Sequence, residues 1–280
     1  MRGDGVICPL FFLLFCQENY DTILQNERKF KTMKIILSPA KKMNIDTDTL
    51  AYQELPVYLE QTKEILTWLK EKTYEELVSL WKCNEAIARQ NVERLQDMDL
   101  YKNLTPAILA YEGIAYQYMA PTVFEEQQLA YVQEHLRILS AFYGVLKPMD
   151  GVTPYRLEMQ AKANVNKQKN LYDFWGDNVY SKCKDEDGII INLASKEYSK
   201  CIEKFLTPSD TYITCTFCEM DKGKLVQKGT YAKMARGEMV RFMAEKQIKN
   251  PEEIKEFNRL GYVFRENLSC ATEYVFERKI

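Results

Sequence analysis

Histidine is almost absent from this 280-residue chain, and so are the short motifs of the common enzyme classes. His135 is the single histidine, which excludes a metal site built from several histidines of one chain. The sequence also has no G-x-x-x-x-G-K-[ST], no G-x-G-x-x-G after a strand-like run, no H-E-x-x-H and no G-x-S-x-G. These absences argue against P-loop nucleotide hydrolysis, dinucleotide chemistry, zinc proteolysis and serine hydrolysis. We predict no cofactor.

Apolar runs long enough to cross a membrane are lacking as well. The run VICPLFFLLFC at 6–16 is eleven residues long, whereas a membrane-spanning helix needs about 20. It resembles the core of a signal peptide, but Arg2 is offset by Asp4 and no A-x-A-like cleavage site follows. A signal peptide is therefore the alternative. We expect residues 1–32 to be an extension outside the fold, from an upstream start, and 33–280 to form one domain without a membrane association.

An excess of charge of either sign is missing too. The 38 basic and 40 acidic residues give a net charge of −2, so a broadly cationic nucleic-acid-coating protein is excluded and any basic site must be local. The eight cysteines have no regular spacing, which favours reduced thiols in the cytoplasm over a disulfide framework. Cys215 and Cys218 form a lone C-x-x-C, and we interpret them as apolar strand residues, not as zinc ligands. No metal site is predicted.

Hydrophobic periodicity predicts a helix-rich first half. The run KIIL at 34–37 is typical of a buried strand that ends before Pro39. Helical spacing of apolar residues then predicts helices within 56–82, 84–96, 105–119 and 124–148. Thr105 as N-cap and Pro106 as first helical residue mark the start of the third.

The second half alternates between helices and strands. Helices are predicted at 171–183, 195–202 and 229–248, and strands at 188–194 and 211–217, the latter followed by a turn at 221–224. Two alternating segments within 262–278 indicate an antiparallel hairpin. Strands separated by helices imply an α/β or α+β single domain, with a mixed sheet covered by helices.

Basic residues gather at predicted loops and helix ends. Lys41 and Lys42 follow the first strand, where an α/β sheet commonly presents its ligand crevice. Segment 154–170 carries a local net charge of +3, and helix 231–246 carries +2. Such groups can bind phosphates, but from charge alone a solvated surface or ion pairs with Glu158 is the favoured interpretation. Likewise, the aromatic residues of LYDFWGD at 171–177 can stack on bases, but a core position is the more common role.

Six stretches carry a resemblance to a known family. They are MKIILSPAKKMN, HLRILSAFYGVLKPMDGVTPYRLEMQ, LYDFWGD, INLASKEYSK, YAKMARGEMVRFM and FNRLGYVF. In this order they resemble the YaaA family of bacterial peroxide stress proteins from Met33 to about Arg278. The resemblance implies a single α/β domain of unusual fold that acts in the cytosol during peroxide stress. It also implies limitation of unincorporated iron, protection of DNA, and binding of double-stranded DNA in a positively charged cleft with a helix-hairpin-helix-like element.

The family motifs transfer to specific positions of this chain. S-P-A-K matches 38–41, P-Y-R-L-E-M matches 154–159, and Y-A-K-x-A-R-G matches 231–237. Ala141 in LSAFYG stands where the family commonly has glycine, and a Cβ there weakens a close backbone approach to phosphate. Lys147 replaces the usual arginine of the next turn and keeps the charge without the planar fork.

Three hypotheses follow for the function. The leading one is a non-enzymatic DNA-binding protein whose basic cleft is lined by Lys41, Lys42, Arg137, Lys147, Arg156, Lys233, Arg236 and Arg241. The second is an enzyme for a small or nucleotide-like substrate, with Lys41 as nucleophile or base and Glu158 as general acid/base. Its further pocket candidates are Ser38, Tyr155, Asn192, Ser195 and Tyr198. The third, iron sequestration by carboxylates and cysteines, is disfavoured. An enclosed pocket favours the second hypothesis, and an open groove the first.

Overall fold

A mixed sheet forms the centre of the structure, a computed structural model that describes residues 33–279. The predicted extension at 1–32 lies outside this range. The order of the strands across the sheet is β11-β12-β9-β8-β1-β5-β6, and β10 pairs with β9 at one end. The strands are β1 (Met33–Leu37), β5 (Leu136–Ser140), β6 (Gly144–Leu146), β8 (Ile189–Asn192), β9 (Thr211–Asp221), β10 (Lys224–Val226), β11 (Tyr262–Phe264) and β12 (Glu273–Arg278).

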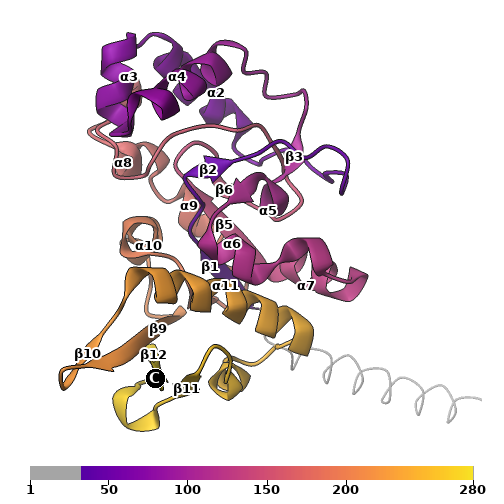
Figure 1. The fold of residues 1–280 in the computed structure, drawn as a ribbon, viewed down its shortest axis with the longest axis vertical. Coiled ribbons are helices and arrows are strands. Elements are labelled where there is room, and N and C mark those ends of the chain that lie inside the picture. The colour runs from indigo at the N-terminus through magenta and orange to yellow at the C-terminus, as the bar shows by residue number, and fades with distance from the viewer. Residues whose placement is uncertain (1–32, 280) are drawn as a thin grey trace, which may run out of the picture.

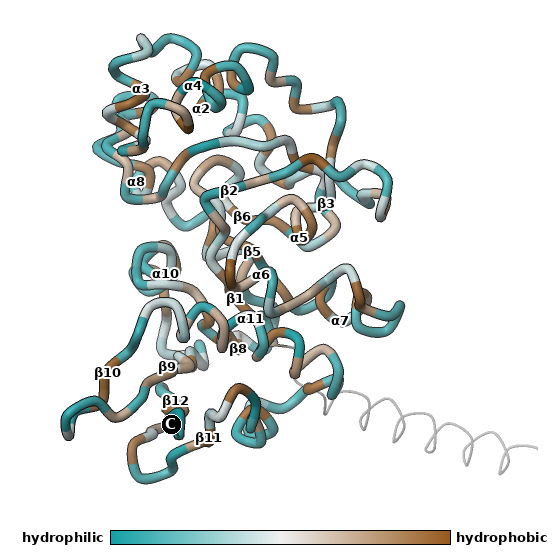
Figure 2. The backbone as a smooth tube through the Cα atoms, viewed as in Figure 1, coloured by the Kyte–Doolittle hydropathy of each residue, from teal (hydrophilic) through white to brown (hydrophobic). Residues whose placement is uncertain are grey.

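The five inner strands run parallel and the edges are antiparallel. Ile35 of β1 lies opposite Leu136 of β5 on one side and opposite Ile191 of β8 on the other. Because these strands have neighbours on both sides, β8 is buried along its whole length and β1 nearly so. Such strands read as continuous apolar runs, without alternation. Figure 2 shows this as hydrophobic colouring at β1 in the middle of the molecule, against mostly hydrophilic outer turns.

Helices and two small strand pairs surround the sheet (Figure 1). The helix α11 packs against both α6 and α7, and α7 also contacts β1 and β5. The C-terminal hairpin lies at the end of the molecule opposite α2, α3 and α4. The helices are α2 (Leu59–Lys70), α3 (Tyr74–Trp81), α4 (Glu85–Gln96), α5 (Ala107–Ala110), α6 (Ile114–Met119), α7 (Glu126–His135), α8 (Leu171–Trp175), α9 (Asn178–Ser181), α10 (Lys196–Glu203) and α11 (Gly229–Lys246). The small pairs are β2 (Lys42–Met43) with β4 (Tyr111–Glu112), and β3 (Thr105–Pro106) with β7 (Gly151–Val152).

Most of the predicted elements are confirmed. The first strand, the helix at 84–96, the strand at 188–194 and the helices at 195–202 and 229–248 appear as β1, α4, β8, α10 and α11. The antiparallel C-terminal hairpin is formed by β11 and β12. One hydrophobic core extends through the described residues, which confirms a mixed α/β fold in a single domain.

Two predicted helices in the first half are wrong. The expected helix at 105–119 is broken into β3, α5, β4 and α6, and the Thr105 hydroxyl accepts a hydrogen bond from the Asp46 N–H at 2.8 Å instead of capping a helix. The expected helix at 124–148 ends at His135 and continues as β5 and β6. An apolar run that a parallel strand buries on both faces satisfies helical spacing by chance, so periodicity alone cannot separate the two.

Two other predicted helices are each split. Segment 56–82 contains α2 and α3, because Thr73 starts a new helix with a capping box to Glu76. Segment 171–183 contains α8 and α9, separated at Gly176, whose φ of +54° a residue with a side chain rarely adopts.

Aromatic residues of the LYDFWGD stretch lie mainly in the core. Trp175 is fully buried, and its indole N–H donates to the Ala141 carbonyl oxygen at 2.9 Å. Its ring lies directly over Gly144, where an added Cβ would come within 2.7 Å of the ring. Glycine is therefore required at 144, and the segment around Ala141 is fixed by core packing.

Cys215, Cys218 and His135 all occupy buried positions in the described part of the chain. Cys215 and Cys218 are buried in β9, as predicted for strand residues. The buried His135 ring contacts the Met33 carbonyl oxygen through Nδ1 at 2.8 Å, and burial lowers its pKa.

Between residues 33 and 279, no three His, Cys, Asp or Glu side chains converge as metal ligands. Each helix in the same range is too short or too polar to span a bilayer.

Gly237 sets the distance between α11 and α6. A Cβ at this position would lie 1.8 Å from the carbonyl oxygen of Ala115 in α6. Backbone cannot move aside as a flexible side chain can, so only glycine permits this approach. The contact matters for function because α6 and the first turns of α11 carry side chains of the pocket described below.

We expect Gly237→Ala to lower the free energy of unfolding by about 2–3 kcal/mol or more, because the helices must separate. Gly229→Ala, in the same helix, is the matched control, since an added Cβ there meets nothing within 4 Å. It should leave stability unchanged or raise it slightly. Chemical denaturation of both variants measures the difference. Equal stability of the two variants would contradict the tight helix contact.

Candidate functional site

A pocket of about 380 Å³ lies beyond the carboxyl ends of β1 and β8. The chain leaves β1 toward β5 on one side and leaves β8 toward β9 on the other. Neighbouring parallel strands whose connections diverge in this way form a topological switch point, where open α/β sheets commonly bind ligands. The pocket walls come from the loops after these two strands, from α6 and α11, and from segment 155–158.

Ser38 and Ser195 connect the ends of the two strands. The Ser195 backbone N–H donates to Ser38 Oγ at 2.8 Å, and the Ser38 hydroxyl donates to Ser195 Oγ at 3.1 Å. Tyr116 of α6 donates from its hydroxyl to the Ser38 carbonyl oxygen at 3.1 Å. This arrangement leaves the Ser195 hydroxyl hydrogen without an acceptor among residues 33–279. Ser195 can therefore donate to a ligand.

Glu158 holds two basic side chains at one end of the pocket. Its Oε1 atom lies 3.0 Å from Lys41 Nζ and 2.9 Å from Arg156 Nη2. Arg156 also donates to the Lys41 carbonyl oxygen at 3.2 Å, so segment 155–158 is tied to the loop after β1. Arg156 and Glu158 are mostly buried, whereas the Lys41 side chain is 65% exposed. Lys41 and Glu158, the two residues that the enzyme hypothesis named from the sequence, are therefore in direct contact.

Tyrosine rings form much of the pocket wall. The Tyr155 hydroxyl is hydrogen-bonded to the Tyr111 hydroxyl at 3.0 Å and to Ser140 at 2.8 Å, away from the solvent. Burial raises the pKa of Tyr155 to about 12 and also raises the pKa of Tyr198. Both phenols are therefore neutral at physiological pH, and the wall adds no negative charge.

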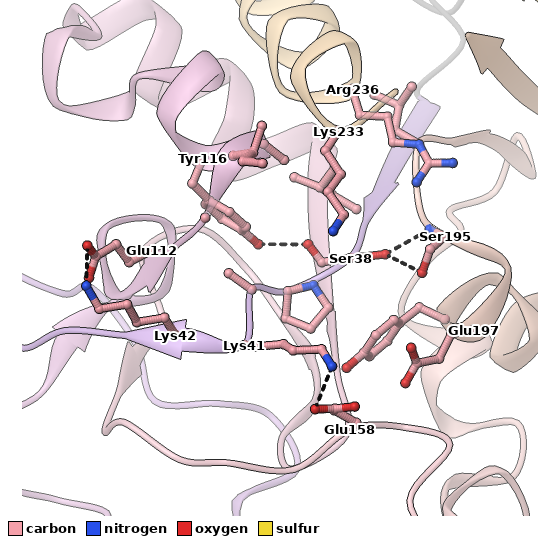
Figure 3. Close-up of a pocket in the computed structure, with 18 of the residues that line it drawn as sticks. Ser38, Lys41, Lys42, Glu112, Tyr116, Glu158, Ser195, Glu197, Lys233 and Arg236 are labelled. Atoms are coloured by element: carbon pink, nitrogen blue, oxygen red, sulfur yellow. Dashed lines mark hydrogen bonds and ion pairs between the residues drawn. The ribbon is translucent and has the colours of Figure 1, made fainter. Parts of the chain in front are cut away.

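Lys233 and Arg236 supply the pocket's unpaired positive charge. They lie three residues apart on α11, and thus on one face of the helix. Neither forms an ion pair with another described residue, and the buried Arg236 Nε has no hydrogen-bond partner in that part of the chain. Burial without an acidic neighbour lowers the pKa of Arg236. Figure 3 shows both side chains reaching from α11 toward Ser38 and Ser195.

The pocket as a whole is weakly basic. Five basic and three acidic side chains line it, a net charge of +2 at neutral pH. The acidic residues are Glu112, which pairs with Lys42 at 2.7 Å, Glu158, and Glu197, which accepts from the Gln160 N–H at 3.2 Å. Glu112 balances Lys42, and Glu158 and Glu197 together balance Lys41 and Arg156 in number, so the net charge of +2 equals that of Lys233 and Arg236.

Several residues proposed from the sequence lie elsewhere. Arg137 and Lys147 line a separate hollow, where Lys147 pairs with Glu54 at 2.8 Å and Arg137 donates to backbone carbonyl oxygens. Asn192 is buried and holds the turn after β8, donating to Thr214 and accepting from the Ala194 N–H. Of the basic residues predicted to line one cleft, Arg137 and Lys147 therefore line a different hollow from the pocket of Lys41 and Lys233.

Arg241 also points away from the pocket. Five residues after Arg236, it is rotated by roughly 140° around the helix. It pairs there with Glu245 at 2.7 Å, and Arg259 bridges Glu245 and Glu238 at 2.5 and 2.9 Å. Lys233, Arg236 and Arg241 therefore do not all project from one face of α11 toward the predicted cleft.

Three pocket residues with polar side chains were not predicted from the sequence. Glu112 and Tyr116 lie in the segment that was predicted as a continuous helix, and Glu197 directly follows the predicted strand–helix junction. The position of Glu197 at the carboxyl end of a central strand was a usable signal. Glu112 and Tyr116 had none, because they reach the site only through the break at Gly113.

The structure is thus a mixed α/β domain with a weakly basic pocket at a switch point of its sheet, a position where open α/β sheets commonly bind ligands. The comparisons define the family. The family model for peroxide stress protein YaaA matches residues 33–268, so the chain belongs to this family, as its motifs indicated.

Curated relatives agree with the family model. A UPF0246 protein of Agathobacter rectalis is 69% identical over 248 residues, covering 89% of this chain and all of the relative. UPF0246 proteins of Desulfitobacterium hafniense and Lachnoclostridium phytofermentans are 57% and 54% identical over 244 residues, each covering 87% of this chain and 97% and 96% of the relative.

Proposed function

We propose that this peroxide stress protein acts by binding a small anionic molecule in the pocket between α11 and the ends of β1 and β8. The observation that carries the proposal is the pair Lys233 and Arg236, which face the pocket without an acidic partner among the described residues. A partly buried guanidinium without a counter-charge is costly, and a phosphate or carboxylate would satisfy it with charge-assisted hydrogen bonds.

The enzymatic hypothesis receives less support. A lysine becomes a nucleophile or base when burial or a neighbouring positive charge favours its neutral form. Lys41 is instead largely exposed and forms an ion pair with Glu158. We therefore restrict the proposal to binding, with Lys41 and Glu158 as parts of the pocket wall and not as catalytic groups.

Arg236→Gln should weaken the binding of inorganic phosphate by roughly 10- to 100-fold, because a hydrogen bond to a charged group contributes about 1.5–3 kcal/mol. Its stability should not fall, since the substitution removes an unpaired buried charge. Calorimetric titration at fixed ionic strength, with denaturation as the folding test, measures both.

Arg241→Gln is the matched control for this experiment. It removes the same charge from the same helix, but at a position outside the pocket. Phosphate binding that is equally weak in both variants, or unchanged in Arg236→Gln, would show that net charge and not this pocket attracts the anion.

DNA binding is the second candidate function, and one observation favours it. Lys41 and Lys42 are 65% and 73% exposed, and with exposed Lys233 they ring the mouth of the pocket. Solvent-facing lysines around a hollow can contact successive phosphates of a duplex. Lys41 and Lys42 are paired with acids, however, which reduces the charge they offer.

If duplex DNA binds at this mouth, its affinity should fall steeply with salt, with a slope of about −0.9 per phosphate contact. Substituting Lys41, Lys42 and Lys233 together by Gln should make this slope shallower by up to about three contacts. Fluorescence anisotropy over a salt series provides the measurement. The recessed Arg236 should contribute little. A slope that the triple substitution leaves intact would move DNA binding away from this surface.

We place the function in the cytosol, where limiting unincorporated iron protects DNA from peroxide. The cysteines at 83, 183, 201, 215, 218 and 270 are unpaired, which suits a reducing compartment. In a bacterium lacking its own copy, the protein should restore survival in hydrogen peroxide and lower the free iron seen by electron paramagnetic resonance. Arg241→Gln should do the same and Arg236→Gln should not. Full complementation by Arg236→Gln would separate the pocket from the stress function.

A further inference from the structure

The pocket has two chemically different ends. Figure 3 shows Lys233 and Arg236 on one side of Ser38 and Ser195, and Glu158 and Glu197 on the other. The first end offers hydrogen-bond donors, and the second offers carboxylate oxygens as acceptors. A ligand that satisfies both ends must therefore be asymmetric.

The donor end is suited to a phosphomonoester. Lys233 contributes an ammonium group, Arg236 a guanidinium fork and Ser195 a hydroxyl hydrogen without an acceptor among residues 33–279. A phosphomonoester carries three acceptor oxygens and a charge between −1 and −2, which matches several donors with an unneutralised positive charge better than a single carboxylate does.

The acceptor end is suited to hydroxyl or amino groups. Both basic partners of Glu158 approach the same atom, Oε1, so its Oε2 atom has no partner in the described part of the chain. Glu197 likewise uses Oε1 for the Gln160 N–H, and no described residue contacts its Oε2. Lys41 and Arg156 balance these two carboxylates in number, so this end carries no net charge. The unpaired charges of Lys233 and Arg236 therefore favour the anionic group of a ligand at the opposite end.

The apolar part of the pocket wall is suited to a ring. Tyr116, Tyr155 and Tyr198 line the pocket together with Leu37, Leu157 and Leu193. The hydroxyls of Tyr116 and Tyr155 are already bonded within the protein, so their rings present mainly apolar surface. A volume of about 380 Å³ lies at the lower end of the range of small-molecule sites, which is about 300–1,000 Å³.

We infer that the ligand is a phosphomonoester of a small hydroxylated or aminated ring compound, with its phosphate at Lys233 and Arg236 and its hydroxyl or amino groups at Glu158 and Glu197. A free nucleoside monophosphate and a sugar phosphate share this chemistry. The inference rests on the proposed anion binding and adds the identity of the opposite end of the ligand.

Four probes separate the contributions of the two ends. Adenosine 5′-monophosphate and ribose 5-phosphate carry both the phosphate and the donors, phenyl phosphate carries phosphate and a ring without donors, and adenosine lacks the phosphate. We expect at least one of the first two to bind about 10-fold or more tightly than phenyl phosphate, and adenosine to bind weakest. Which of the two binds more tightly identifies the source of the ligand.

Variants of the acceptor end provide the structural test. Glu197→Gln should remove most of the roughly 10-fold advantage of the donor-bearing ligands over phenyl phosphate. Binding of phenyl phosphate and inorganic phosphate should change by less than about twofold. Glu158→Gln should also reduce the advantage, while phosphate binding holds or improves because Lys41 and Arg156 lose their counter-charge. Arg241→Gln again serves as the control, and denaturation confirms that each variant is folded.

Two results would overturn the inference and leave anion binding standing. One is equal affinity for phenyl phosphate and both donor-bearing ligands, and the other is an advantage that survives in Glu197→Gln and Glu158→Gln alike. If no phosphate-bearing probe binds, or if Arg236→Gln binds them all as well as the parent protein, the proposed function itself fails. The two failures are therefore distinguishable.

Discussion

The position of β1 inside the sheet is the constraint on which the site depends. Pairing with parallel strands on both sides fixes the register of β1 and the height at which its carboxyl end emerges beside that of β8. The following residues must diverge from those of β8, because the connections run to opposite sides of the sheet. The hydrogen bonds between Ser38 and Ser195 close the gap at its base, and the remaining opening becomes the pocket.

The basic residues around this opening differ in whether a carboxylate forms an ion pair with them. Lys42 pairs with Glu112, and Lys41 and Arg156 share the carboxylate of Glu158, with Glu197 as a second acid in the same lining. The two α11 cations lack such partners in the described part of the chain. In a protein whose total charge is nearly balanced, an imbalance confined to one hollow tells more about a ligand than the overall composition does.

The sequence predicted the central strands β1 and β8 more accurately than the segment 105–148, where strands were predicted as helix. Short β-branched runs such as 34–37 and 188–194 could be recognised because only a buried strand explains them, and Lys41 and Ser195 follow directly from their ends. The run at 136–140 could not, because its apolar residues continue the spacing of α7 and nothing in the chain marks His135 as the last helical residue.

The site itself was predictable only where motifs were local. Lys41, Arg156, Glu158, Lys233 and Arg236 were all named from short stretches of sequence and they do converge at one pocket. Whether a basic residue is paired can depend on a tertiary partner far along the chain, as Lys147 with Glu54, 93 residues away, illustrates. Such partnerships leave no signal in a single sequence.

The anchoring of α11 has a consequence for the speed of recognition. Gly237 seats the helix against the α6 backbone, and Arg259 clamps it from the other side through Glu238 and Glu245. These contacts fix the backbone that carries Lys233 and Arg236. If the proposed anion binds here, the conformational entropy lost on association is mainly that of these two side chains, and the rate is set by diffusion and electrostatic steering.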